Sequence, residues 1–122
     1  MDIPYGSDAA KKFTTNVGLI TSDGPHGQNI MACEWTHLVS YSPGIVAVCV
    51  GAGKATLDNI RAKNFFGVSL SSVSQNVLAS IAGNNSGKDV DKIKALEEIG
   101  FKFYAGRRIS VPLVLGSSLN LE

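Results

Sequence analysis

The 122-residue chain is long enough for one domain with one hydrophobic core, and its composition is that of an ordinary globular protein. Eleven basic and ten acidic residues leave a net charge of +1, which excludes an electrostatic footprint for nucleic acid or an anionic membrane. No apolar run approaches the roughly 18 residues of a membrane span, and the first residues do not resemble a secretion signal. We therefore expect a soluble, cytoplasmic protein. Since only 17% of the residues are charged and 44% are hydrophobic, we also expect a partner to cover some apolar surface.

Strands are predicted wherever a short apolar run is bounded by turn residues. The clearest turn is Asp-Gly-Pro-His-Gly at 23–27. The run at 45–50 is continuous and β-branched, which predicts a buried strand. The predicted strands are 17–22, 29–38, 45–50, 65–70 and at least one within 111–121.

Short helices are predicted between these strands, because apolar residues recur at helical spacing after good capping residues. Gly83 and Gly100 are expected to end the second and third helices. Several strands with short helical insertions favour a mainly β chain that forms a small barrel. The predicted helices are 57–63 capped by Thr56, 75–82 capped by Ser74, and 90–99 after a capping box at 86–89.

The segment 50–56 (Val-Gly-Ala-Gly-Lys-Ala-Thr) joins a predicted strand to a predicted helix. Its two glycines let the backbone approach a ligand closely, and the start of a helix attracts an anion through its N–H groups and dipole. Lys54 adds a full positive charge. The segment is not a Walker A loop, because it lacks the required spacer. By itself it fits either a phosphate site or a solvated lysine beside an ordinary capped helix.

The segment 29–37 (Asn-Ile-Met-Ala-Cys-Glu-Trp-Thr-His) is the second candidate site. An extended strand of small and amide-bearing residues offers backbone donors and acceptors to a flat heteroaromatic ring. From the residues alone, a half-buried core strand with Trp35 packed inside is the better interpretation.

Other chemistries receive little support from the sequence. The two histidines, His26 and His37, do not stand at metal-ligand spacing with cysteines or carboxylates, so no metal site is expected. No Gly-x-Ser-x-Gly nucleophile elbow is present. Cys33 and Cys49 each lie in an apolar run and are expected to be buried, reduced thiols.

Several short motifs follow one another between residues 17 and 122: Val-Gly-Leu-Ile-Thr-Ser at 17–22, Thr-His-Leu-Val-Ser-Tyr-Ser-Pro at 36–43, Lys-Ala-Thr-x-x-Asn-Ile at 54–60, Phe-Phe-Gly-Val-Ser at 65–69, and Ser-Gly-Lys-Asp-Val-Asp-Lys at 86–92 followed by Gly100. In this order they resemble the flavin reductase-like, FMN-binding split-barrel family. The chain departs from the family pattern at Gly44, where a second proline is usual, and at Glu34, where Ser or Asn is common. The family also continues beyond the position of Glu122 with further strands.

The resemblance implies a mainly β chain with short helices, folded as an FMN-binding split β-barrel of Greek-key type. It implies a single domain over residues 1–122 that lacks the family's usual C-terminal strands. The implied cofactor is FMN, with FAD as the alternative. The flavin ring and ribityl chain would lie along Asn29, Met31, Ala32, Cys33, Glu34, Trp35 and Thr36, and the phosphate on Gly51, Ala52, Lys54, Ala55 and Thr56.

The reaction implied by the resemblance is reduction of bound flavin by NAD(P)H, followed by electron transfer to a downstream acceptor. The cofactor carries the reactivity in such chemistry, and the protein binds and orients it. Family members are homodimers with flavin near the subunit interface, so a homodimer is expected here, with neither nucleic acid nor membrane as a partner. Two other functions stay open: an FMN-binding electron carrier without NAD(P)H turnover, and a split-barrel interaction or dimerisation domain without flavin.

Overall fold

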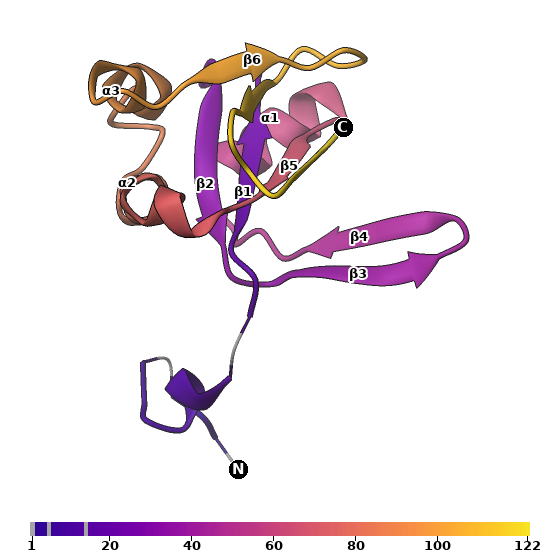
Figure 1. The fold of residues 1–122 in the computed structure, drawn as a ribbon, viewed down its shortest axis with the longest axis vertical. Helices are drawn as coiled ribbons and strands as arrows, with labels where there is room; N and C mark the ends of the chain where they lie inside the picture. The colour runs from indigo at the N-terminus through magenta and orange to yellow at the C-terminus, as the bar shows by residue number, and fades with distance from the viewer. Residues whose placement is uncertain (1, 5, 14) are drawn as a thin grey trace.

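A computed structural model describes residues 2–4, 6–13 and 15–122. The strands are β1 (Gly18–Ser22), β2 (Asn29–Cys33), β3 (Thr36–Tyr41), β4 (Gly44–Val48), β5 (Gly67–Leu70), β6 (Phe103–Ala105), β7 (Pro112–Val114) and β8 (Leu119–Leu121). Four of them form an antiparallel sheet in the order β2-β1-β5-β8, while β3–β4 and β6–β7 form separate hairpins. The β3–β4 hairpin projects from the rest of the molecule, and the N-terminal segment also extends away from the central sheet (Figure 1).

Helices connect the strands and cover the sheet. They are the 3-10 turns η1 (Ala10–Lys12) and η2 (Val73–Gln75) and the α-helices α1 (Ala55–Lys63), α2 (Asn76–Asn84) and α3 (Lys92–Glu98). In Figure 1, α2 and α3 lie together beside β2, on one side of the sheet. α1 packs against β1 and β2. Within the described ranges, no helix has the length and apolar character needed to cross a bilayer.

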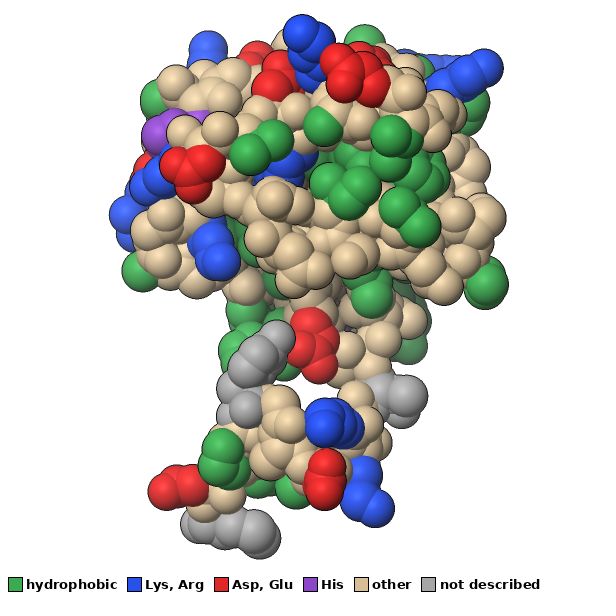
Figure 2. Space-filling view, turned by 90° about the vertical axis from the view of Figure 1, so that its left-hand side faces the viewer, with side chains coloured by type: hydrophobic (Ala, Val, Ile, Leu, Met, Phe, Trp, Pro, Cys, Tyr) green, Lys and Arg blue, Asp and Glu red, His purple; other side chains and the backbone are tan. Residues whose placement is uncertain are grey.

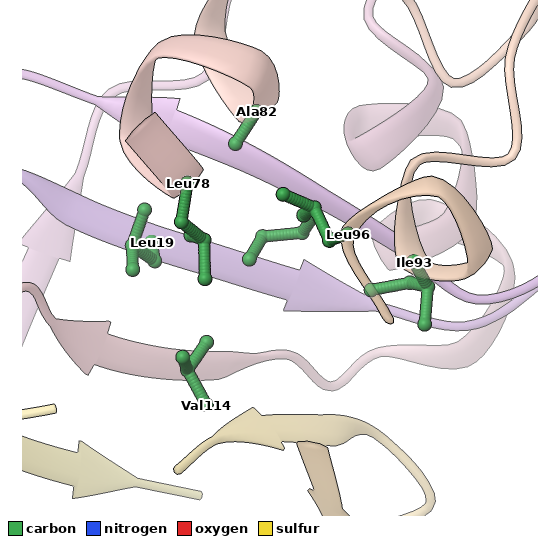
Figure 3. Close-up of a cluster of buried hydrophobic side chains, with 7 residues drawn as sticks. Leu19, Leu78, Ala82, Ile93, Leu96 and Val114 are labelled. Carbon is green, nitrogen blue, oxygen red and sulfur yellow. The ribbon is translucent and has the colours of Figure 1, made fainter. Parts of the chain in front are cut away.

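The central strand β1 contributes side chains to two hydrophobic clusters, because successive side chains on a strand point to opposite faces. Leu19 faces α2 and α3, whereas Ile20 joins Cys33 and Val68 on the other face of the sheet. Each fully buried aliphatic side chain contributes roughly 1.5–3 kcal/mol. The cluster under the helices, most of which Figure 3 labels, consists of Leu19, Ile30, Leu78, Ala82, Ile93, Leu96 and Val114.

Two strand predictions need correction. The segment 29–38 is two strands rather than one, because the chain bends at residues 34–35 between β2 and β3. The run 45–50 was expected to be a buried strand, but β4 ends at Val48 and its residues are exposed or half-buried. β4 pairs with β3 alone, and only its end, at Val48, packs against the cluster of Ile20, Cys33 and Val68 on the central sheet. The expected mainly β architecture with short helical insertions is confirmed.

The predicted caps of the first two helices are wrong. α1 begins at Ala55 after Lys54, so Thr56 lies inside the first turn rather than at the N-cap. Ser72, not Ser74, forms a capping box, and it does so with Gln75 at the start of η2. Ser72 and Ser74 are equivalent caps two positions apart, so local sequence does not separate them, and at α1 the N-cap position is held by a residue whose side chain makes no cap.

The ends of α2 and α3 also differ from the prediction in part. α2 continues through Gly83 to Asn84. The start of α3 is capped by Asp91, whose Oδ1 accepts a hydrogen bond from the Lys94 N–H at 3.0 Å, so the predicted capping box at 86–89 is wrong. Gly100 follows α3 with φ 100°, a backbone conformation that glycine adopts without strain, and the expected end of this helix is confirmed.

Candidate functional site

A cavity of about 350 Å³ opens between the start of α1, strand β2 and the segment that joins α2 to α3. This volume is in the range of small-molecule sites. The opposite wall is formed by residues 82–87 together with Lys92. The predicted cofactor residues that meet at the cavity, from two separate motifs, are Asn29, Met31, Ala32, Ala52, Lys54, Ala55 and Thr56.

Lys92 places a buried ammonium group at this cavity. The residue is 2% exposed, and its Nζ donates to the carbonyl oxygens of Ala82 at 3.0 Å and Asn85 at 3.1 Å. Burial, and then the nearby charge of Lys54, lowers the pKa of Lys92 to about 8. An ammonium group has three donors, so one remains for a ligand. Figure 2 shows a basic side chain set into a hollow of the face that carries α2 and α3.

Asn29 lies on the wall of the cavity with only one end of its amide satisfied. Its Nδ2 donates to the Thr56 hydroxyl at 2.9 Å. Its Oδ1 is buried and has no hydrogen-bond partner among the described residues. The backbone of Gly87 lies against this amide so closely that a Cβ atom there would collide with it. A buried acceptor without a partner costs roughly 1–3 kcal/mol, so a ligand that donates a hydrogen bond here would be stabilised.

The start of α1 supplies backbone donors to the same cavity. The first N–H groups of an α-helix have no partner within the helix. The N-cap residue Lys54 provides no side-chain cap, so the N–H groups of Ala55 and Thr56 are available to a ligand. Gly53, with φ 80°, turns the chain into the helix in a conformation that favours glycine. Together with the charge of Lys54, these groups favour an anion.

Five of the predicted site residues do not line the cavity, and Cys33, Thr36 and Gly51 are three of them. Cys33 points to the opposite face of the sheet, into the cluster with Ile20. Thr36 is buried at the start of β3, where its hydroxyl donates to the Cys33 carbonyl at 3.1 Å. Gly51 is exposed, and its carbonyl accepts from the Lys54 N–H at 3.4 Å in the turn before α1.

Glu34 and Trp35 lie at the bend between β2 and β3, away from the cavity. Trp35 is 60% exposed rather than packed inside, because the bend turns it out of the sheet. With Glu34 it lines a separate hollow beside the N-terminal segment.

The cysteines also differ from the prediction. Cys33 is buried as expected, but Cys49, directly after β4, is exposed because the hairpin is uncovered. Both are free thiols. In the described part of the chain, no group of three or more His, Cys, Asp or Glu side chains could hold a metal ion.

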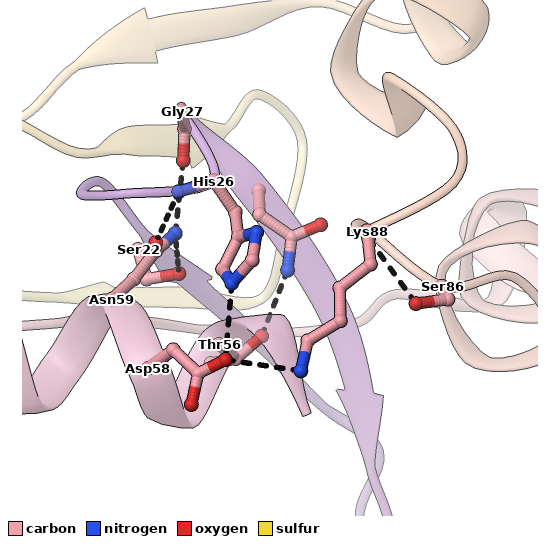
Figure 4. Close-up of polar contacts among 9 residues, drawn as sticks. Ser22, His26, Gly27, Thr56, Asp58, Asn59, Ser86 and Lys88 are labelled. Atoms are coloured by element: carbon pink, nitrogen blue, oxygen red, sulfur yellow. Dashed lines mark hydrogen bonds and ion pairs between the residues drawn. The ribbon is translucent and has the colours of Figure 1, made fainter. Parts of the chain in front are cut away.

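A polar network joins α1 to the segment that forms the opposite wall (Figure 4). Asp58 Oδ2 lies 3.1 Å from Lys88 Nζ and 3.0 Å from His26 Nε2. These contacts, with Lys88 the larger influence, lower the pKa of the Asp58 carboxyl. The carboxylate therefore carries its charge at neutral pH and neutralises Lys88.

Lys92 and the segment 82–87 were not predicted to lie at the site. No local signal separates Lys92 from Lys88 or Lys94, since all three stand in one polar stretch. Lys92 is buried because the end of α2 packs over it and provides two carbonyl acceptors. Such burial depends on tertiary structure and is not encoded in a short motif.

Comparisons with solved structures agree with this fold. Flavoredoxin of Desulfovibrio vulgaris (Miyazaki F) matches with a TM-score of 0.74 at 24% identity, over 95% of this chain and 62% of flavoredoxin. An FMN-binding protein from Thermus thermophilus, solved with bound 1-cyclohex-2-enone, matches with a TM-score of 0.81 at 18% identity. The match covers 98% of this chain and 63% of that protein. An NADH:FAD oxidoreductase of Streptomyces globisporus C-1027 matches with a TM-score of 0.77 at 21% identity. The match covers 98% of this chain and 72% of that protein. The expected split-barrel fold is confirmed.

Comparison of sequences gives the family. An uncharacterized protein of Pyrococcus abyssi is 26% identical over 104 residues, which are 85% of this chain and 58% of that protein. The chain thus spans about three fifths of the length of this relative and of flavoredoxin. The model of the flavin reductase like domain matches residues 10–122. This match covers most of the sequence, and the chain belongs to the flavin reductase-like domain family.

Proposed function

We propose that this chain binds FMN, with the phosphate held in the cavity between α1, β2 and the 82–92 segment, and that it acts in an NAD(P)H-dependent flavin oxidoreductase. The observation that carries the proposal is the meeting of Lys54, Lys92 and the uncapped start of α1 at one cavity. Membership of the family supports flavin as the ligand.

The residues of the cavity fit the phosphate end of FMN. A phosphate monoester carries a charge near −2 at neutral pH, which two ammonium groups would balance. The N–H groups of Ala55 and Thr56 suit phosphate oxygens. The unpartnered Asn29 Oδ1 needs a donor, and a hydroxyl of the ribityl chain would provide one. We therefore assign the phosphate to the two lysines and the ribityl chain to Asn29.

Bound flavin would supply the redox chemistry, taking a hydride from NAD(P)H and passing electrons to a downstream acceptor. The side chains of this protein would bind and orient it. Met31 and Ala32 line the same cavity as Asn29 and would guide the ring. The comparisons include an FMN-binding protein and an NADH:FAD oxidoreductase, so FAD is the alternative ligand to test. A cytoplasmic location suits a donor such as NAD(P)H and two free thiols.

We also propose that the working form is a homodimer in which a second copy covers the β3–β4 hairpin. The hairpin stands apart from the central sheet (Figure 1) and exposes a group of large hydrophobic side chains. An exposed apolar patch of this kind commonly marks a protein interface. The exposed residues are Leu38, Val39, Tyr41 and Ile45.

The direct test of the function is an absorption spectrum of the purified protein after incubation with FMN or, separately, with FAD and desalting, followed by NADH or NADPH without oxygen. We expect retained flavin bands that bleach on adding one of the two nucleotides. Retained flavin that only a chemical reductant bleaches would replace the oxidoreductase with an electron carrier. No retention of FMN or FAD would overturn the proposal and favour a flavin-free interaction domain.

A further inference from the structure

We propose that Asp58 is a positioning residue for the phosphate cavity: by holding Lys88 it fixes the segment 85–91 as a wall of the cavity. The inference rests on the proposed function, since it deepens the account of the same site. Asp58 itself does not line the cavity. It lies in the first turn of α1, two residues after Thr56, which does line the cavity.

The Asp58 carboxylate joins three segments that are distant in the sequence. It belongs to α1, Lys88 belongs to the segment after α2, and His26 belongs to the turn between β1 and β2. Figure 4 shows His26 and Lys88 converging on this carboxylate. Both ion-pair partners are only partly exposed, at 36% for Asp58 and 39% for Lys88. Partial burial reduces screening by solvent and salt.

The turn around His26 is fixed independently of Asp58. The next residue, Asn59, accepts a hydrogen bond from the His26 N–H at 3.0 Å through its Oδ1. Its Nδ2 donates to the Gly27 carbonyl at 2.9 Å and to the Ser22 hydroxyl at 3.2 Å. Asn59 is fully buried. The turn and α1 are therefore held together by Asn59, and the Asp58 carboxylate on α1 is free to pair with Lys88.

Within the segment 86–90, Lys88 provides the described side-chain bond to α1. Its other described hydrogen bonds are internal: the Ser86 hydroxyl accepts from the Lys88 N–H, and the Ser86 carbonyl accepts from the N–H groups of Asp89 and Val90. Lys88 is the one side chain of 86–90 with a described bond to α1. The segment is thus a turn with its own internal structure: the flanking residues Asn85 and Asp91 are bonded to Lys92 and Lys94, and the ion pair is its one described side-chain bond to α1.

The position of this turn decides the shape of the cavity. Gly87 presses on the Asn29 amide, and Ser86 and Gly87 both line the cavity. If the turn moved away, Asn29 would lose its cover and the wall opposite Lys54 would open. Charge balance supports the same role: Lys88 is neutralised by Asp58, which leaves Lys54 and Lys92 to face a phosphate dianion.

The test compares Asp58→Asn with Asp89→Asn, a matched control. Asp89 is an exposed carboxylate in the same turn with no described side-chain contact, so both variants remove one negative charge near the site. Hydrogen exchange is measured on the flavin-free proteins, and affinities are measured for FMN and for riboflavin, which lacks the phosphate. We expect faster exchange at residues 86–91 and an FMN affinity about threefold weaker in Asp58→Asn alone, with a smaller loss for riboflavin, whose ribityl chain also meets Asn29.

A second pair of variants breaks the same contact from its other side. Lys88→Gln leaves α1 intact and should reproduce the faster exchange, whereas Lys94→Gln, on α3, should not. Asp58→Glu, which keeps the charge, should restore much of the FMN affinity. These variants separate loss of the ion pair from any weakening of α1, because Asp58 also lies in the first turn of that helix.

Two results would overturn the positioning role: exchange at 86–91 in Asp58→Asn equal to that in Asp89→Asn, or equal losses of affinity for FMN and riboflavin. Failure of the proposed function looks different, because the wild-type protein would then bind neither flavin. In that case the exchange data from flavin-free protein alone decide whether Asp58 holds the turn.

Discussion

At the scale of single residues, the cavity depends on two lysines in contrasting settings. Lys54 lies in an exposed loop before α1, whereas Lys92 is buried and bonded to two backbone carbonyls. No carboxylate contacts Lys92 among the described residues, so its charge is not balanced by an ion pair. Burying an unbalanced charge is unfavourable, and an anion in the cavity would relieve that cost.

Replacing Lys54 tests whether the loop reaches phosphate. We expect Lys54→Ala to weaken FMN binding by about 1.5–3 kcal/mol, the usual size of a charge-assisted hydrogen bond, and to leave riboflavin binding almost unchanged. Fluorescence titration of both flavins measures the difference. Lys63→Ala, at the exposed end of α1, is the matched control. Equal losses for both flavins would show that Lys54 does not contact phosphate.

The lowered pKa of Lys92 predicts a pH dependence of FMN binding. In the proposed site the ammonium form of Lys92 is the form that would bind phosphate, and the pKa of about 8 means that this form declines as pH rises through 8 in the free protein. FMN affinity should therefore fall between pH 7 and 9.5, by up to about tenfold per pH unit above 8, while the phosphate keeps its charge. Titrations of FMN and riboflavin across this range measure the effect, with Lys92→Met as the variant that should remove it. A constant FMN-to-riboflavin ratio in the wild type would contradict this role of Lys92.

At the scale of elements, the packing of the 85–91 turn on β2 predicts a strict requirement for glycine at position 87. A Cβ atom at Gly87 would collide with the Asn29 amide, which is buried and bonded to Thr56 and so cannot swing aside freely. Gly87→Ala should cost about 1–3 kcal/mol of stability and also weaken FMN binding. Asp89→Ala, at an exposed residue of the same turn with no described side-chain contact, is the control. Thermal unfolding with equal midpoints for the two variants would count against this packing.

The elements also show what the sequence could and could not predict. β1 was predictable because it is a continuous apolar run before a strong turn, and it is buried throughout. The helix starts were misplaced because Thr56 and Ser74 are good caps by composition, although other residues hold those positions. Apolar character predicted burial for β4, but it could not say that this strand stays outside the central sheet, with its residues exposed or half-buried.

The cavity was predictable on one side only. Both motifs that line its first wall, around Asn29 and Lys54, carry recognisable chemistry in a short stretch of sequence. The second wall comes from the end of α2 and the turn after it, where burial of Lys92 and the fit of Gly87 arise from packing between distant segments. A single sequence does not reveal such contacts.

At the scale of the whole molecule, the projecting hairpin predicts self-association. Val39 is 59% exposed on β3, within the apolar group that we expect a second copy to cover. Val39→Asp should convert a dimer to a monomer, because a charge in the buried centre of an interface is unfavourable. Val73→Asp, at a position that is 89% exposed outside the hairpin, should not. Light scattering after size-exclusion chromatography measures the mass, and a mass unaffected by Val39→Asp would contradict the proposed interface.

The measurement that tests the central claim most directly is the ratio of the affinities of the wild-type protein for FMN and riboflavin at pH 7. The two ligands differ only in the phosphate, which we assign to Lys54, Lys92 and the start of α1. Two charge-assisted contacts predict that FMN binds at least about 100-fold more tightly. Equal affinities would mean that the cavity does not hold the phosphate, and the proposed site would have to be abandoned even if the protein binds flavin elsewhere.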